Sequence, residues 1–559
     1  NQAKLSTEPR IPVLSTWENE YALSMVQTGD EPFDYNEAIT RPDWDSPSHD
    51  CWKSAIKVEH DDLWKYKCFE WVDRPEDVKV LTAKFVLKQK PDRKKARLVA
   101  RGLEQDLNDV GETYSPVCRT ETIRAMFAGL VAQGWSICQL DVRNTYIMAP
   151  IITPVYMHPP QGMKKNGDKI LKVNKALYGL KESARAWYLE LKKFMRSVDM
   201  HPSSADPCLF LSPDKKLKIA CYVDDLVAFS SDQSLIDEFL IKIQEKFDIR
   251  DLGRPDNFIG IQIKYHDKDI SLVQTNMIER CLRRYNHTPA IRRTPMDSDL
   301  VLTREDHADT KPDHTEFRSI CGSLNYIAQT TRPDISFSMR ALMQHVANPS
   351  HAHLKQAYRV LSYLAHTRTD GLTYRGDPTT EVQGYSDADW AGDPDTRRST
   401  SGRVFMRHGA AIMWNSKQQR GVALSTAEAE YVALTEAGRD AIWLRKLYAD
   451  LGLTQKHSTL LHEDNASAIK WTGDATKWAR TKHIDIAHHA IRDWREAGRL
   501  RIAYCPTGDM LADLMTKPLP QATHTRLTQL CLGKPIVSQR NLPNVVFHKS
   551  SMGRRARKT

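Results

Sequence analysis

Residues 219–229 read IACYVDDLVAF and place two adjacent acids, Asp224 and Asp225, between two apolar runs. Apolar residues on both sides predict the two buried strands of a hairpin, with the acids at its turn. Paired carboxylates in a buried sheet are costly, because like charges repel and lose their water. Mg2+ removes that cost, since it binds hard oxygen ligands from carboxylates and substrate phosphates. From this stretch alone, an ordinary Asp-Asp turn explains the pattern as well as a metal site does.

The composition indicates a globular chain with several domains. Its 559 residues correspond to about three or four domains, and a charged fraction of 27% with 41% hydrophobic residues argues against disorder. The formal charge of +10 favours a polyanionic partner. The ten cysteines form no Cys-x-x-Cys pair, which argues against a zinc module and for a reducing compartment. No apolar run has the length of a membrane span, and the start at Asn1 without a signal peptide predicts an internal product or a fragment.

Two regions before this hairpin carry residues that suit the same chemistry. A helix is expected from Thr120 to near Gly134, followed by a strand over 135–142 that carries Asp141 near its end. Asp141 is the third carboxylate that a two-metal centre would need. In the basic run 88–101, Lys95 and Arg97 alternate with strand-forming residues and could contact triphosphate oxygens. A solvated basic hairpin explains that run equally well.

A second set of acids lies in the C-terminal part of the chain. Asp387 follows an apolar strand position, and Asp464 ends an apolar strand. Ser425 begins a helix with the capping-box pattern S-x-x-E. Glu430 shares a face of that helix with residues that should pack on a sheet, and a carboxylate on a packing face is explained by metal binding. Asp513 is the fourth acid of this set.

In their order and spacing, these motifs resemble the reverse transcriptase and RNase H portion of Ty1/copia-type LTR retrotransposon Pol polyproteins. The similarity covers about residues 50 to 520. The stretches that carry it, besides the two acid sets, are Lys95–Ala100, Asp141 with Tyr146, Val155–Met157, Leu177–Lys181, Tyr222–Asp225, Asp251–Gly253, Gly322–Tyr326 and Thr331–Ile335.

The resemblance implies an α+β multidomain fold, with a right-hand polymerase followed by a connection and an RNase H-like α/β domain. The RNase H-like part is expected to have a mixed five-stranded sheet flanked by helices. The expected boundaries are a linker at 1–45, fingers at 46–140, a palm at 141–265, a thumb and connection at 266–378, the RNase H-like domain at 379–520 and a basic C-terminal tail at 521–559.

The resemblance also implies roles for individual residues. Two Mg2+ ions per active site, or Mn2+ in their place, would be bound by the catalytic acids Asp141, Asp224 and Asp225 in the palm and Asp387, Glu430, Asp464 and Asp513 in the RNase H-like domain. Substrate contacts are expected from Lys95, Arg97, Tyr178, Gly179, Lys181 and Tyr222, and from Phe258 and Gly260 in a primer-grip hairpin. Tyr146 would lie beneath the sugar and reject a ribose 2′-hydroxyl, although a core aromatic residue is its alternative interpretation.

The implied function is RNA- and DNA-directed DNA polymerisation with RNase H activity. The implied partners are an RNA template, a DNA primer, an RNA–DNA hybrid and dNTPs, with no membrane; a homodimer is left open. The implied location is cytoplasmic, within virus-like particles, and the basic tail suits nuclear entry. The alternative is a decayed or domesticated remnant that binds nucleic acid without catalysis, and Thr145 and Glu182-Ser183 do depart from the family's pattern.

Three smaller expectations complete the sequence-based picture. The cations Arg280, Arg283, Arg284, Arg292 and Arg293 could follow a duplex backbone or form a solvated face. The stretch 505–509 lacks the loop histidine of retroviral RNases H, and His483 is interpreted as structural. Ser386, Asp389, Glu463 and Asp509 are left outside the catalytic set.

Overall fold

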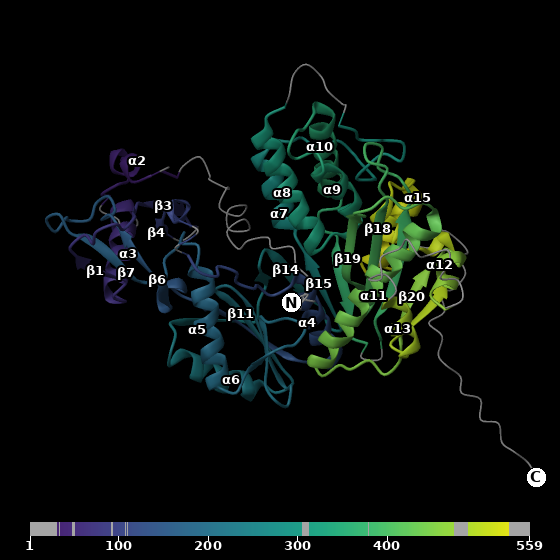
Figure 1. Ribbon diagram of the computed structural model, residues 1–559, viewed down its shortest axis with the longest axis horizontal. Coiled ribbons are helices and arrows are strands. Elements are labelled where there is room, and N and C mark those ends of the chain that lie inside the picture. The colour runs from purple at the N-terminus through teal and green to yellow at the C-terminus, as the bar shows by residue number, and fades with distance from the viewer. Residues whose placement is uncertain are drawn as a thin grey trace, which may run out of the picture.

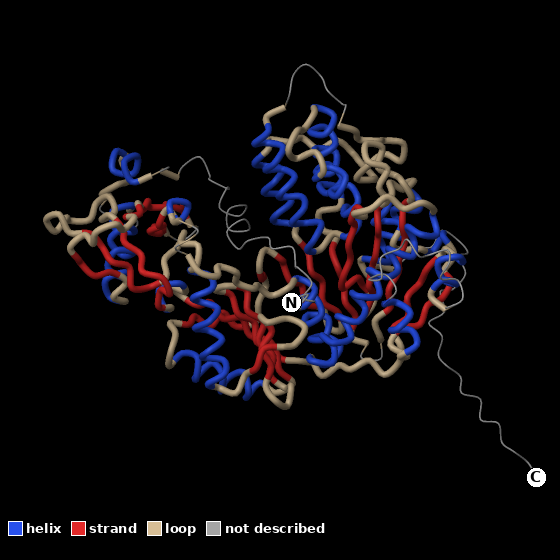
Figure 2. Tube along the Cα trace, viewed as in Figure 1, coloured by secondary structure: helices blue, strands red, loops and turns tan. Residues whose placement is uncertain are grey.

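The described residues form four packed units in the computed structural model (Figure 1). The structure describes residues 31–535, apart from 33, 47–50, 91–92, 107, 109, 305–311, 378–379 and 474–489. The N-terminal unit and the C-terminal unit lie at opposite ends of the molecule, with a six-stranded unit and a helical unit between them (Figures 1 and 2). The expected basic tail beyond residue 535 and His483 lie outside the described residues.

The N-terminal unit contains a four-stranded sheet of order β1-β7-β6-β2 and the separate hairpin β3-β4. Phe85 and Leu98 of this hairpin are buried, and Lys95 and Arg97 alternate with the buried positions of β4. The basic run therefore forms a hairpin, while the triphosphate contacts of Lys95 and Arg97 stay a prediction. The elements of the unit are α2 (Tyr35–Thr40), α3 (Trp52–Lys65), β1 (Phe69–Val72), β2 (Val80–Leu81), β3 (Ala83–Gln89), β4 (Lys94–Ala100), η1 (Gly102–Glu104), β6 (Pro150–Met157) and β7 (Ile170–Lys175).

The expected linker at 1–45 differs from the structure in its last part. Asp34 caps α2 by accepting a hydrogen bond from the N–H of Glu37. The ring of Tyr35 then packs 5.6 Å from Trp44 and 6.2 Å from Phe85. These aromatic contacts bind α2 to the β3-β4 hairpin, and single-sequence patterning did not reveal them.

The six-stranded unit is an antiparallel sheet of order β12-β5-β11-β10-β9-β8. Its central strands are the predicted hairpin and the predicted strand that carries Asp141, and its core is formed by their apolar residues together with α4, α5 and α6. The elements are α4 (Thr120–Gln133), β5 (Ser136–Val142), η2 (Tyr146–Met148), α5 (Ser183–Ser197), β8 (His201–Pro202), β9 (Leu209–Leu211), β10 (Leu217–Tyr222), β11 (Asp225–Ser230), α6 (Gln233–Gln244) and β12 (Ile249–Gly253).

Helix α4 begins and ends at the predicted residues, and a residue from a distant part of the chain accepts hydrogen bonds at its N-terminus. Asp206, distant in sequence, accepts hydrogen bonds from the backbone N–H of Arg119 at 2.9 Å and from the hydroxyl of Thr122 at 2.6 Å. The C-terminal cap is Gly134 with φ of +64°, the left-handed conformation that glycine adopts at low cost.

The helical unit combines a four-stranded sheet, β13-β14-β15-β16, with four helices and one 3-10 turn. Its centre contains a buried ion pair between Arg332 and Asp334, which Tyr363 joins through its hydroxyl. The elements are β13 (Asn257–Phe258), β14 (Ile261–Tyr265), β15 (Asp269–Val273), α7 (Thr275–Arg284), α8 (His314–Thr330), η3 (Pro333–Ile335), α9 (Ser336–Met343), α10 (His351–His366) and β16 (Gly371–Arg375).

The C-terminal unit is built on a mixed five-stranded sheet of order β19-β18-β17-β20-β21, as the resemblance implied. Strands β17, β18 and β19 are antiparallel, whereas β20 and β21 run parallel to β17. The elements are β17 (Gln383–Asp389), β18 (Thr400–Arg407), β19 (Ala410–Gln418), α11 (Thr426–Asp450), β20 (Thr459–Glu463), α12 (Ala466–Trp471), α13 (Ala490–Glu496), β21 (Leu500–Tyr504), η6 (Thr507–Asp509), α14 (Asp513–Thr516) and α15 (Gln521–Cys531).

The expected tail at 521–559 differs from the structure at its start, because residues 521–531 form α15. His524 and Leu527 of this helix are buried, and the His524 ring packs 5.6 Å from Tyr363 of the helical unit. This helix therefore joins the C-terminal unit to the helical unit.

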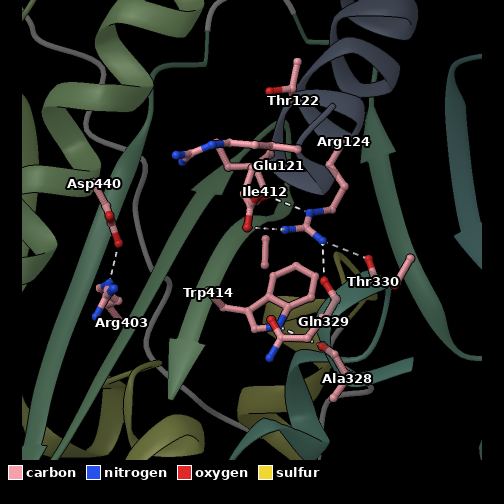
Figure 3. A network of polar contacts seen from close by, with 12 residues as sticks. Glu121, Thr122, Arg124, Ala328, Gln329, Thr330, Arg403, Ile412, Trp414 and Asp440 are labelled. Carbon is pink, nitrogen blue, oxygen red and sulfur yellow. Dashed lines mark hydrogen bonds and ion pairs between the residues drawn. The ribbon is translucent and has the colours of Figure 1, made fainter. Parts of the chain in front are cut away.

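A buried arginine, Arg124, connects three units (Figure 3). From α4 it donates hydrogen bonds to the carbonyl oxygens of Ile412 at 2.8 Å, Gln329 at 2.7 Å and Thr330 at 3.0 Å. Its guanidinium lies 4.0 Å from the ring centroid of Trp414, whose indole N–H donates to the carbonyl of Ala328. The six-stranded, helical and C-terminal units are therefore joined through backbone carbonyls that would otherwise lack this donor.

Two chemical expectations can be compared with the whole described chain. All ten cysteines are buried and unpaired, while the expected reducing compartment stays a prediction. Among the described helices, none combines the length and apolarity needed to cross a membrane.

Candidate active sites

The first candidate site is the turn of the β10-β11 hairpin. Tyr222 pairs with Asp225, which leaves Val223 and Asp224 as the two turn residues. Val223 has φ of +58°, a strained conformation for a β-branched residue. Two hydrogen bonds hold the turn: the Trp187 indole N–H donates to the Val223 carbonyl at 2.7 Å, and the Val142 N–H donates to the Asp224 carbonyl at 3.0 Å.

Strand register brings Asp141 to this turn. Asp141 on β5 lies directly opposite Asp225 on β11, a position at which Cα atoms are about 4.5–5.5 Å apart. Burial, and then the charges of Asp224 and Asp141, raise the pKa of Asp225 to about 7. Burial also raises the pKa of Asp224, although the positive charge of Arg97 opposes that rise. Three carboxylates that repel one another in a partly buried site fit the donor set of a divalent cation.

Arg97 of the N-terminal unit lies beside two aromatic residues, Tyr178 and Tyr146. The Arg97 guanidinium lies 4.5 Å from the ring centroid of Tyr178, and the rings of Tyr178 and Tyr146 meet edge to face at 4.7 Å. Lys95 neighbours Arg97: burial, and then the charge of Arg97, lower the pKa of Lys95. Arg97, Tyr178 and Tyr146 thus form a contact series, in which each side chain touches the next. The positive charge of Arg97 also lowers the pKa of Asp224.

Gly179 explains why this series is held in place. Its φ is +91°, and a Cβ there would lie 2.1 Å from the carbonyl oxygen of Ala100. The close approach allows the Ala100 N–H to donate to the Tyr178 carbonyl at 2.8 Å. Glycine at this position therefore fixes the basic hairpin against the residues before α5.

Other predicted substrate contacts lie apart from this series or in the core. The Lys181 ammonium donates to the carbonyl of Gln105 at 2.6 Å. Phe258 is buried, and Gly260 with φ of +76° forms the turn of the β13-β14 hairpin. The Tyr326 hydroxyl donates to the carbonyl of Ile259 in that turn. Tyr146 is 6% exposed, so its core role and its predicted role beneath a sugar remain compatible with the structure.

The second candidate site lies at the ends of β17 and β20 beneath α11. Asp387, Glu430 and Asp464 offer carboxylate oxygens that all lie within 4.8 Å of one another, and they form the one such group found among the described residues. Oε2 of Glu430 is buried and has no hydrogen-bond partner. Burial is the main cause that raises the pKa of Glu430, and neighbouring carboxylates raise it further. This donor set fits a divalent metal ion.

Asp513, the fourth predicted acid, lies beside this group with a lysine partner. The Lys517 ammonium is 2.8 Å from Oδ1 of Asp513 and 3.8 Å from Oδ2 of Asp387. Burial and the charge of Asp387 raise the pKa of Asp513, and Lys517 opposes that rise. The Thr516 hydroxyl also donates to Asp387.

Sequence reasoning missed two residues at this site. Glu463 was left outside the set, yet it is fully buried and its Oε2 has no partner. Its position two residues after Leu461, on the same strand face, is the signal that could have placed it under α11. Lys517 was missed as well, although its spacing of four residues from Asp513, just beyond the short helix α14, is a signal for their contact.

The two departures from the family's pattern have structural partners. Glu182 is buried and accepts hydrogen bonds from the N–H of Thr153 at 3.2 Å and its hydroxyl at 2.8 Å. The Thr145 hydroxyl donates to the carbonyl of Val142 at 2.9 Å. In the 505–509 stretch, the Thr507 hydroxyl donates to Oδ2 of Asp464 at 2.8 Å.

Two carboxylate clusters, one beside basic side chains on an antiparallel sheet and one on a mixed sheet, define a class of enzyme that uses divalent metals on phosphate-containing substrates. Residues 66–297 match the model of the family described as reverse transcriptase (RNA-dependent DNA polymerase). Over most of its length the chain is similar to the Pol polyproteins of copia-type retrotransposons, which confirms the predicted resemblance. RNA-directed DNA polymerisation and RNase H activity stay predictions for this chain.

The relatives cover nearly the whole chain but are much longer than it. A retrovirus-related Pol polyprotein from transposon TNT 1-94 of Nicotiana tabacum is 33% identical over 537 residues, covering 92% of this chain and 40% of the relative. A retrovirus-related Pol polyprotein from transposon RE2 of Arabidopsis thaliana is 36% identical over 447 residues, covering 79% of this chain and 30% of the relative. A solved foamy viral protease–reverse transcriptase in complex with double-stranded DNA has 14% identity, a TM-score of 0.47 and coverage of 81% of this chain and 70% of that one. The chain thus spans less than half the length of these two plant relatives.

Proposed function

We propose that this chain is an RNA- and DNA-directed DNA polymerase that also cleaves the RNA of an RNA–DNA hybrid. The main observation in support is the pairing register of β5 and β11, which places Asp141 opposite Asp225. The strained turn at Val223 lies beside this pair and contains Asp224. In this proposal the N-terminal unit acts as fingers, the six-stranded unit as palm, the helical unit as thumb and connection, and the C-terminal unit as the RNase H-like domain.

At the palm, Asp141, Asp224 and Asp225 would hold two Mg2+ ions, which supply charge stabilisation for in-line phosphoryl transfer when they are bound. Arg97 and Lys95 would contact the triphosphate of the incoming dNTP, since their charges already act on Asp224 from across the site. Tyr146, backed by the Tyr178 ring, would lie beneath the sugar and exclude a 2′-hydroxyl. Tyr222, Gly260 and the turn after Phe258 would position the primer strand.

At the RNase H-like site, Asp387, Glu430 and Asp464 would hold the metal ions and Asp513 would complete the set. Lys517 neutralises part of the charge of Asp387 and Asp513, so it keeps two carboxylates close together before a metal binds. RNA would be distinguished from DNA through its 2′-hydroxyl.

The partners follow from this chemistry: an RNA template, a DNA primer, the hybrid that they form, and dNTPs. Copying and degradation of an element's own RNA would take place in cytoplasmic virus-like particles.

Primer extension and hybrid cleavage by the purified full chain, with Mg2+ or Mn2+, test the proposal. Asp224→Asn should abolish extension, because an amide carries no charge to hold the cations, and it should leave cleavage of preformed hybrid largely intact. Asp464→Asn should give the reverse pattern. Wild-type chain that binds primed template but neither extends it nor cuts hybrid would instead favour the non-catalytic remnant.

A further inference from the structure

A basic cavity of about 380 Å³ opens between the helical unit and the C-terminal unit. The segment before α8, the helix α10 and the start of α15 line it, and its main polar lining residues are Arg292, Arg293, Thr294, Asp297, Arg359 and Gln521. We call these six residues the arginine pocket. Three arginines against one acid leave an excess of positive charge.

The innermost arginine of the pocket, Arg359, is only partly satisfied. It donates to Oγ1 of Thr294 at 3.1 Å and pairs with Oδ1 of Asp297 at 2.5 Å. Its Nε is buried and has no hydrogen-bond partner. Burial lowers the pKa of Arg359, the carboxylate of Asp297 opposes that shift, and the charge of Arg292 adds to it. The single carboxylate of Asp297 leaves the three guanidiniums with a net positive charge, which a bound anion would reduce.

The other two arginines are available to such an anion. Arg292 and Arg293 are exposed, and neither forms an ion pair with a residue in the described part of the chain. Beside them, α15 begins after Pro520, which offers no side-chain acceptor to the first N–H groups of the helix. The contact of His524 with Tyr363 fixes this helix end against α10. The three guanidiniums are therefore the main donors that line the cavity, and Asp297, the one carboxylate in its lining, is already paired with Arg359.

The pocket lies near the second acid cluster. Lys517 contacts Asp387 and Asp513, and Pro520 at the rim of the pocket follows three residues later. Three residues span at most about 11 Å of chain. Phosphates along one strand of a duplex are spaced about 3.4 Å along its axis. A duplex at the acid cluster would therefore carry phosphates within a few nucleotides of the pocket.

We propose that the arginine pocket binds a backbone phosphate of the RNA–DNA hybrid whose RNA strand lies at the second acid cluster. This inference rests on the proposed RNase H function of that cluster. Paired guanidiniums bind a phosphate by bidentate hydrogen bonds. The contact holds the hybrid at a fixed register, so it acts on binding and on the place of cleavage, not on the bond-breaking step.

The test compares Arg292→Gln/Arg293→Gln with Lys193→Gln/Arg196→Gln, a control that removes the same charge from exposed positions on α5. Both pairs are placed in the full chain carrying Asp464→Asn, and binding of a fluorescent RNA–DNA hybrid is measured by anisotropy over a range of salt concentrations. The pocket variant should bind about tenfold more weakly at 0.1 M salt, and the slope of log K against log salt should fall by about 1. The control should differ from the parent by less than twofold.

A second measurement changes the hybrid before it changes the chain. Hybrids that carry one neutral methylphosphonate at successive positions are bound to the chain with intact arginines. One or two adjacent positions, at a fixed distance from the cleavage site, should weaken binding, and Arg292→Gln/Arg293→Gln should remove that position dependence. Equal weakening at every position, or binding by the pocket variant equal to that of the control, would overturn the proposal.

The outcomes separate this inference from the function on which it rests. If wild-type chain does not cut hybrid, the RNase H proposal fails. If it cuts hybrid while the pocket variant binds hybrid as tightly as its parent does, the pocket proposal alone fails. Loss of binding to inorganic [32P]phosphate or to an acidic peptide, with unchanged hybrid binding, would assign the pocket to another anion and would also overturn the proposal.

Discussion

Replacing Arg124 by methionine should loosen the junction between the six-stranded, helical and C-terminal units. Methionine keeps the apolar stem of the side chain but removes the donors to the carbonyls of Ile412, Gln329 and Thr330. A buried acceptor left without its donor costs about 1–3 kcal/mol. The lost cation–π contact with Trp414 adds about 0.5–2 kcal/mol.

These costs are offset in part, because the folded variant no longer buries a guanidinium. We expect the free energy that holds the junction closed to fall by about 3–5 kcal/mol, the range found when one partner of a buried charged contact is removed. Since about 1.4 kcal/mol corresponds to a factor of ten, the open form of the junction should become about 140- to 3,700-fold more populated.

Hydrogen exchange measures this opening directly, because junction amides exchange through local unfolding. Amides in 411–415 of β19 and 327–331 at the end of α8 should exchange faster in Arg124→Met, while those of the β3-β4 hairpin should keep their rates. Arg196→Met, at an exposed position of α5, is the matched control and should change stability by less than about 0.5 kcal/mol. Junction amides that exchange in Arg124→Met as slowly as in the control would refute the reasoning.

Three further predictions concern single residues. Tyr146→Val should lower the ratio of kcat/KM for dNTPs over rNTPs, and an unchanged ratio would return Tyr146 to a purely core role. Trp187→Phe removes the N–H that holds the Val223 carbonyl, so kcat for extension should fall about tenfold with little change in KM for dNTP, and hybrid cleavage should stay at the wild-type rate. Burial raises the pKa of Asp334, but the ion pair with Arg332 outweighs it and holds that pKa below the ordinary 3.8. The pair therefore stabilises the fold above about pH 4 and loses this contribution as pH falls further, so Asp334→Asn should destabilise at pH 7 in urea unfolding, with a difference that shrinks toward pH 3.

Short-range sequence patterns predicted those parts of the fold whose structure depends on the residues of a single strand or helix. The apolar runs around Asp224 and Asp225 gave the hairpin, because each run needs only its own alternation to become a buried strand. Asp141 was placed by its position at a strand end, and Glu430 by the packing face of its helix. These acids carry a local signal, since a charge in an apolar stretch is unusual.

Contacts between distant segments could not be read in the same way. The three carbonyls that bind Arg124 lie more than 200 residues away in sequence, and backbone oxygens have no sequence signature. The helices α2 and α15 were assigned to a linker and a tail because both are short and polar in pattern, and each is stabilised by aromatic contacts with another segment. The arginine pocket likewise joins residues 292 and 521, which only the folded chain brings together.

The two acid clusters differ in where their balancing charge comes from. Arg97, which opposes the raised pKa of Asp224, belongs to a different unit from the acids it faces. Lys517 opposes the raised pKa of Asp513 in the second cluster. It belongs to the same unit as that cluster and follows Asp513 by only four residues. A displacement of the N-terminal unit would therefore change the electrostatics of the first cluster and leave those of the second unchanged. In the proposed enzyme, we expect such a displacement to alter dNTP binding but not hybrid cleavage.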